Sequence, residues 1–176
     1  MKTQRQIWTD AIEIINTGLN ACDISGYTVK RSNQANLSTR INGLILLDLI
    51  DAIHYGWQGH TDFVQDGSMK HKEELIVTYQ FQVTVLRKLQ ADDTIPHAED
   101  VTETLAMWLQ SERAIRLAKS KGYGLYRVQQ INQPHSDNDS DQYEVTPAFE
   151  FWFETVQELL FDQNAIDGFI SDVKGV

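Results

Sequence analysis

Two long segments in which apolar and polar residues alternate constrain the fold of this chain more than any other feature. In the first, Glu73 to Leu89, the odd positions from 75 to 85 are apolar and the even positions from 78 to 84 are polar. The second, Tyr143 to Val156, repeats the pattern with phenylalanines at 149, 151 and 153. A period of two predicts strands with one face in a core and the other facing water or a partner. We therefore expect both strands in one antiparallel sheet with a helix across one face.

Two other segments predict helices. Residues 3–19 carry apolar side chains at steps of three and four, with Thr3 as a candidate N-cap and Gly18 near the end. Residues 98–120 form the clearest helical pattern, with acidic residues in the first turns and basic residues at the end, which complements the helix dipole. Gly122 is typical of a helix stop. The apolar face of this second helix is expected to contain Val101, Leu105, Trp108, Ile115 and Ala118.

Shorter elements complete the predicted order. Tyr27–Arg31 fits a short strand, and residues 125–131 fit another. Residues 44–54 fit either a helix or a strand, and we favour a strand because the glycines at 56 and 59 suit bends or bulges. The sequence Asp66-Gly67 indicates a hairpin turn before the first long strand.

The chain is expected to form one α+β domain over residues 1–176, an antiparallel β-sheet flanked by an N-terminal helix and a central helix. A single domain of 176 residues buries roughly 70% of the surface that the unfolded chain exposes. A second domain is therefore not expected. Residues 133–142 predict a flexible acidic hairpin loop, and residues 162–176 predict a short helix or an extended C-terminal arm.

Charge and cysteine content narrow the classes of function. The formal net charge is −10, with 25 acidic and 15 basic residues and no basic cluster, so binding to the outside of nucleic acid is disfavoured. The single cysteine, Cys22, fits a reducing cytosol. The most apolar run, residues 43–53, is interrupted by two aspartates, and the N-terminus is not typical of a signal peptide. We expect a protein that is made in the cytoplasm and has no membrane partner.

The motifs that carry catalytic or metal chemistry are incomplete in this sequence. The acidic loop places Asp137, Asp139 and Asp141 as in an EF-hand, but Gln142 and Ala148 replace the required glycine and glutamate. On an extended strand His54, His60 and Asp62 share one face, and polar packing explains them more simply than a metal site. No nucleophile elbow or phosphate-binding glycine loop is present. We therefore expect no catalytic residues, no cofactor, no metal and no enzymatic activity.

The polar faces of the two long strands are the candidate interaction surface. Trp152 projects among glutamates, opposite to the phenylalanines of its strand, so it is either covered by a helix or kept for a partner. The N-terminal helix must also bury its Trp8 stripe against its own sheet or a neighbouring subunit. The residues predicted to lie at a subunit or partner interface are Trp8, Gln80, Gln82, Thr84, Glu150, Trp152 and Glu154.

The layout of the chain resembles the tail-terminator and neck proteins, which join heads to tails in tailed bacteriophages. Three features carry the resemblance: the N-terminal helix QIWTDAIEIINTGL, the strand KEELIVTYQFQVTVL with the helix after it, and the late polar hairpin followed by DQYEVTPAFEFWFETV. Together they span about residues 7 to 156.

The resemblance implies an α+β subunit of a homo-oligomeric ring, expected to be a hexamer, that caps the tail tube and provides the docking surface for the head or neck. The implied partners are further copies of the chain, the tail tube and the sheath protein, and the neck or connector proteins. DNA passes through the lumen without specific binding. The implied location is the tail or neck of the virion, after synthesis in the host cytoplasm.

Two other classes of function stay open at this point. The first is a non-enzymatic module, of another phage or bacterial system, that binds a protein or ligand through the Trp152 face. The second is an enzyme whose site is assembled from distant residues, such as Cys22 with a histidine. The mass of the protein in solution separates the ring from the binding module.

Overall fold

In the computed structural model, described for residues 2–32, 42–126, 128–129, 131–132 and 146–162, the fold is α+β. The sheet of the described residues has five strands in the order β1-β2-β3-β5-β4. Their bounds are β1 Tyr27–Arg31, β2 Gly43–Gln65, β3 Ser68–Arg87, β4 Gly124–Tyr126 and β5 Ala148–Asp162. The helices are α1 Gln4–Ala21, α2 Ala98–Leu109 and α3 Glu112–Ser120. The α+β class is therefore confirmed, although β1 joins β2 in parallel and makes the otherwise antiparallel sheet mixed.

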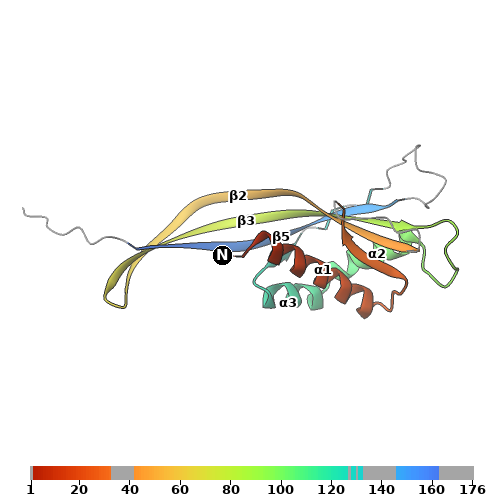
Figure 1. Cartoon of the computed structure of the whole chain (residues 1–176), viewed down its shortest axis with the longest axis horizontal. Coiled ribbons are helices and arrows are strands. Elements are labelled where there is room, and N and C mark those ends of the chain that lie inside the picture. The colour runs from red at the N-terminus through yellow and green to blue at the C-terminus, as the bar shows by residue number, and fades with distance from the viewer. Residues whose placement is uncertain (1, 33–41, 127, 130, 133–145, 163–176) are drawn as a thin grey trace, which may run out of the picture.

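The three helices of the described residues lie at one end of the sheet, on one of its faces. In Figure 1, α1, α2 and α3 form a layer beneath one half of β2, β3 and β5. The other half of these three strands extends well past the helices to the turn at Asp66 and Gly67 (Figure 1). We call this uncovered part, residues 55–76 of β2 and β3 together with residues 156–162 of β5, the arm, and the helix-covered part the body.

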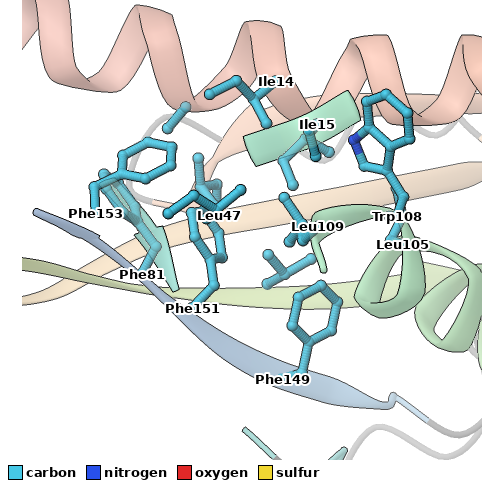
Figure 2. Close-up of a cluster of buried hydrophobic side chains, with 14 of the residues drawn as sticks. Ile14, Ile15, Leu47, Phe81, Leu105, Trp108, Leu109, Phe149, Phe151 and Phe153 are labelled. Atoms are coloured by element: carbon cyan, nitrogen blue, oxygen red, sulfur yellow. The ribbon is translucent and has the colours of Figure 1, made fainter. Parts of the chain in front are cut away.

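Aromatic side chains from β3 and β5 form the centre of the core. Phe81 stacks on Phe151 with ring centroids 5.4 Å apart, and Phe153 meets both rings edge-on. All three rings are fully buried and point from the sheet toward α1, as Figure 2 shows. Trp8 of α1 closes the cluster with its ring edge-to-face on Phe81 at 5.4 Å. The alternation in the two long strands therefore identified the core face correctly.

The N-terminal helix forms as the sequence predicts, except at its end. The Thr3 hydroxyl accepts a hydrogen bond from the Gln6 amide and caps α1. The predicted stripe is buried throughout: Ile7, Trp8, Ala11, Ile14, Ile15 and Leu19. Gly18 does not end the helix, which continues to Ala21. Gly18 instead permits close packing of α1 on the Trp108 ring. A Cβ at Gly18 would lie 2.6 Å from Nε1 of Trp108, so the missing side chain lets α1 approach α2 closely.

The prediction of one helix over 98–120 is wrong, because two helices occupy that segment. After α2 ends, Ser111 begins α3, and its hydroxyl accepts a hydrogen bond from the Ala114 amide. The break changes which residues face the core: Ala114 and Ala118 are buried, whereas Ile115 is 41% exposed. Gly122 is the predicted stop, with φ at +80°.

The strands differ from the prediction mainly at their ends. Asp66 and Gly67 have φ values of +52° and +76°, which confirms a tight hairpin turn, and β3 begins directly after it instead of at residue 73. β2 is a strand, as favoured, with pairing irregularities between Leu49 and Asp51 and between Tyr55 and Gly59. β4 has three residues, which is shorter than predicted, followed by a single bridge between Asn132 and Ala148. β5 runs to Asp162, past the predicted end at 156.

Two polar contacts fix the connections of the body. The Arg87 side chain is 3% exposed, and its guanidinium donates to the carbonyl oxygens of Ile95 and Asp92 at 3.0 and 3.2 Å, which holds the loop between β3 and α2. Tyr123 donates its hydroxyl to Asp10 at 2.9 Å, which joins the end of α3 to α1. Burial raises the pKa of Tyr123, and the hydrogen bond to Asp10 adds to that effect. The Arg87 contacts are local, whereas the Tyr123 contact links segments that are 113 residues apart in sequence.

Several predicted features lie outside the described residues. These are the acidic loop at 133–142, with its aspartates at 137, 139 and 141, and residues 163–176 of the predicted C-terminal arm. Within the described residues, no helix combines the length and the apolar character needed to cross a membrane.

We expect Gly18→Ala to destabilise the protein by about 1–3 kcal/mol, because the added methyl group collides with the Trp108 ring. Helix propensity alone predicts the opposite, a gain of about 1 kcal/mol. Urea unfolding followed by circular dichroism measures the difference. The control is Asn16→Ala, at an exposed position of the same helix, which should change stability by less than about 0.5 kcal/mol. A Gly18→Ala protein as stable as this control would show that α1 and α2 do not pack as described.

Candidate subunit interface

Six of the seven predicted interface residues lie together on the face of the sheet that the helices do not cover. Cross-strand pairing places Gln80 opposite Trp152 and Gln82 opposite Glu150. Glu154 pairs with Thr78 and Thr84 with Ala148, two steps further along the same face. Phe81 and Phe151, the residues between them, point to the helices. We call this surface the outer face.

The carboxylates of the outer face are hydrogen-bonded to neutral donors. Gln80 donates its side-chain amide to Glu150 at 2.7 Å, and the Tyr126 hydroxyl donates to Glu154 at 3.2 Å. Nearby, Asp48 accepts from the Ser32 hydroxyl, and burial raises the pKa of its carboxyl group above the usual range. Because these partners carry no charge, the carboxylates that are ionised keep their negative charge on this face.

Trp152 is nearly covered although no described helix lies on its face. The side chain is 9% exposed, with Gln80 of β3 on one side and Tyr126 of β4 on the other in the strand register. The sequence predicted that Trp152 is either covered by a helix or kept for a partner. Within the described residues, no helix covers it. Its role in a partner contact stays a prediction.

Trp8 lies apart from the other six predicted residues. Its ring is 7% exposed on the helix side of the sheet, between Phe81 and the guanidinium of Arg31, which is 4.8 Å from the ring centroid. The N-terminal helix therefore buries its tryptophan against its own sheet. The sequence left this open, since the same stripe would also suit a neighbouring subunit.

The arm exposes apolar residues that sequence reasoning missed. Ile76 and Val156 pair across β3 and β5, and Leu160 follows two positions beyond Glu158 on the same face. Their side chains are 42%, 53% and 55% exposed. The signal was present in the sequence, because Ile76 is apolar at a position where alternation requires a polar residue. Exposed apolar side chains grouped on one face indicate a contact surface.

Ion pairs surround the apolar residues of the arm. Lys72 lies between Glu74 and Glu158, with its Nζ 2.5 and 2.7 Å from their carboxylate oxygens. The hydrogen bonds that Lys72 donates to Glu158 and, as a smaller cause, to Glu74 raise the pKa of Lys72. Two carboxylates share one ammonium group, so this cluster keeps one net negative charge.

A pair formed by a histidine and an aspartate lies near the tip of the arm. His71 Nδ1 is 2.6 Å from Asp62, and Nε2 is 3.5 Å from Glu73. The hydrogen bond to Asp62 is the main cause that raises the pKa of His71 above its ordinary value of 6.5. Of the histidines that the sequence places on one strand face with Asp62, His54 is exposed, and the side chain of His60 lies outside the described residues. Among the side chains that are described, no three histidine, cysteine or acidic residues are grouped to hold a metal ion.

A groove with basic walls lies between α1 and the edge strand β1. Its volume is about 970 Å³. The described residues that line it are apolar or basic, apart from Gln4: Arg5, Trp8, Ile12, Val29, Lys30 and Arg31. No described carboxylate forms an ion pair with its three basic residues. In a chain of net charge −10, this surface suits an acidic partner.

Comparison with known families assigns the chain. A family model described as E217 gateway protein gp29 matches residues 7–162. The chain belongs to this family. The match begins in the first turn of α1 and ends with the last residue of β5, so it includes both the body and the arm. No curated protein matches the chain significantly.

Membership of this gateway family makes the chain a bacteriophage structural protein and a virion component. The resemblance to phage head-to-tail joining proteins is thereby confirmed at the level of a phage structural family. The narrower role of a tail terminator, the ring, and the partners stay predictions.

We expect the pKa of His71 to lie above 6.5 and to fall when Asp62 is changed to asparagine, because that change removes the negative charge on its main hydrogen-bond partner. A pKa raised by folding means that protonated His71 stabilises the arm tip below pH 6.5, and that this contribution is lost as the pH rises through the folded value. Titration of the histidine ring protons by NMR measures the pKa. Asp66→Asn, at the turn, is the control and should leave the Asp62 contact and most of the shift in place. Equal pKa values in the wild type and Asp62→Asn would contradict the pairing.

Proposed function

We propose that this chain forms a ring at the joint between head and tail, where it caps the tail tube and provides the surface on which the head or neck docks. A hexamer is the expected ring. Copies of the chain would contact one another around the ring, with the tail tube and sheath protein on one side and neck or connector proteins on the other. The role is structural, and no catalytic step is proposed.

The arm is the observation that carries this proposal. Three strands extend past the helix layer and expose Ile76, Val156 and Leu160 to solvent. A lone subunit gains little from such an extension, since three strands without a second layer among the described residues bury few side chains. A neighbouring subunit can supply the missing cover. Family membership supports the proposal, because the family is described as a gateway protein of a phage.

The charge of the chain supports passage of DNA through the ring. A net charge of −10 repels phosphate, and the outer-face carboxylates are bonded to neutral donors that do not offset them. A lumen with such a surface would let DNA move without binding it. The lumen would need a surface that repels DNA, and it would need no site that recognises a DNA sequence.

Light scattering of the purified protein, alone and with isolated tail tubes, tests the proposal. We expect either a mass that matches a hexamer or a monomer that forms rings on tube ends, seen by electron microscopy. Double substitution of Val156 and Leu160 by serine should prevent assembly while the circular dichroism spectrum is unchanged. The control is Met107→Ser, which removes a 73% exposed apolar side chain from α2.

A stable monomer that does not bind tail tubes would overturn the ring proposal. The binding-module alternative would then take its place, with the groove beside β1 as the site for a ligand screen.

A further inference from the structure

Among the described residues, two strand edges at opposite sides of this sheet have no further strand beside them. In this part of the chain β1 is the last strand at one side, where it is bonded to β2, and its residues Val29, Lys30 and Arg31 line the groove. At the opposite side, β4 pairs with residues 152–154 of β5, and beyond residue 154 the described residues place no strand beside that edge of β5. Free edges present unpaired backbone donors and acceptors that invite another strand.

The side chains at these two edges are complementary. On β5, Val156, Glu158 and Leu160 alternate with their neighbours and share one face, so an acidic residue stands between two exposed apolar ones. The groove beside β1 combines apolar Trp8, Ile12 and Val29 with three basic residues. The strand is therefore complementary to the groove: its apolar side chains match the apolar lining, and its carboxylate matches the basic residues.

The two surfaces cannot meet within one chain. In the sheet order, β2 and β3 lie between β1 and β5, and the exposed residues of β5 belong to the arm, whereas the groove belongs to the body. A contact between them must join two copies. Because it uses a different surface on each copy, it is heterologous, and a heterologous contact generates a ring when the rotation between successive copies closes.

We propose that the arm segment Val156–Leu160 of one copy docks into the groove between α1 and β1 of the next copy, with Glu158 facing the basic residues of the groove. This inference rests on the proposed ring and names its subunit contact. Val156 and Leu160 leave water against Trp8, Ile12 and Val29. Glu158 exchanges part of its interaction with Lys72 for Arg5, Lys30 or Arg31 of the neighbour.

A mixed disulfide tests the contact directly. In a Cys22→Ser background, one preparation carries Glu158→Cys and a second carries Lys30→Cys. Mild oxidation of the mixture should give cross-linked dimers that contain one chain of each kind, whereas a chain with both substitutions should give a ladder of multimers up to the ring. The control pair replaces Glu158→Cys by Glu112→Cys, an exposed ion-paired position on α3 outside the contact, and should stay uncross-linked.

Charge reversal gives a second measurement in the full chain. Glu158→Lys and Arg5→Glu should each raise the concentration needed for assembly by about tenfold, and the double variant should recover most of this loss. Glu112→Lys, which also breaks an exposed ion pair, should leave assembly unchanged.

The outcomes separate this inference from the function on which it rests. Rings that form normally but give no mixed disulfide and tolerate Glu158→Lys would overturn the contact while leaving the ring intact; the groove would then take another acidic occupant. A wild-type chain that forms no ring on tail tubes would overturn the proposed function itself.

Discussion

Hydrogen bonding on both sides of β3 is the constraint on which the rest of the structure depends. β3 pairs with β2 from the hairpin turn to Arg87, and with β5 from Lys70 to Thr84. The aromatic rings of Phe81, Phe151 and Phe153 lie in register because of this pairing, and α1 packs on the surface that they form. A shift of β5 by one residue would turn Phe151 and Phe153 to the outer face and remove most of the platform for the helix.

The helix layer is fitted to this platform by specific contacts. The absent side chain of Gly18 brings α1 against Trp108, Arg87 holds the loop into α2, and Asp10 ties α1 to Tyr123. These contacts involve polar atoms or close approaches that hydrophobic patterning does not specify. They determine where the helices sit, and therefore where the groove beside β1 opens.

The sequence predicted the layers of the fold because alternation and helical stripes are local signals. The buried faces of α1, β3 and β5 could all be read from spacing. The break at Ser111 was missed since the segment keeps an approximate helical pattern across it, and only the capping hydrogen bond marks the new start. The outer-face residues were predicted as a group from strand parity, whereas Trp8, predicted as an interface residue with them, lies on the helix side of the sheet against Phe81. The groove and the free edges depend on strand order, which no local pattern encodes.

The partial helix cover divides one continuous sheet into regions that contribute differently to the protein. The body supplies most of the buried surface and therefore most of the free energy of folding, whereas the arm contributes side chains that are half in water. Changes on the arm would leave the melting temperature nearly unaltered even when they abolish association. In the proposed ring, a screen based on thermal stability or soluble expression would pass such variants as wild type, and only an assay of assembly would reveal damage to the arm.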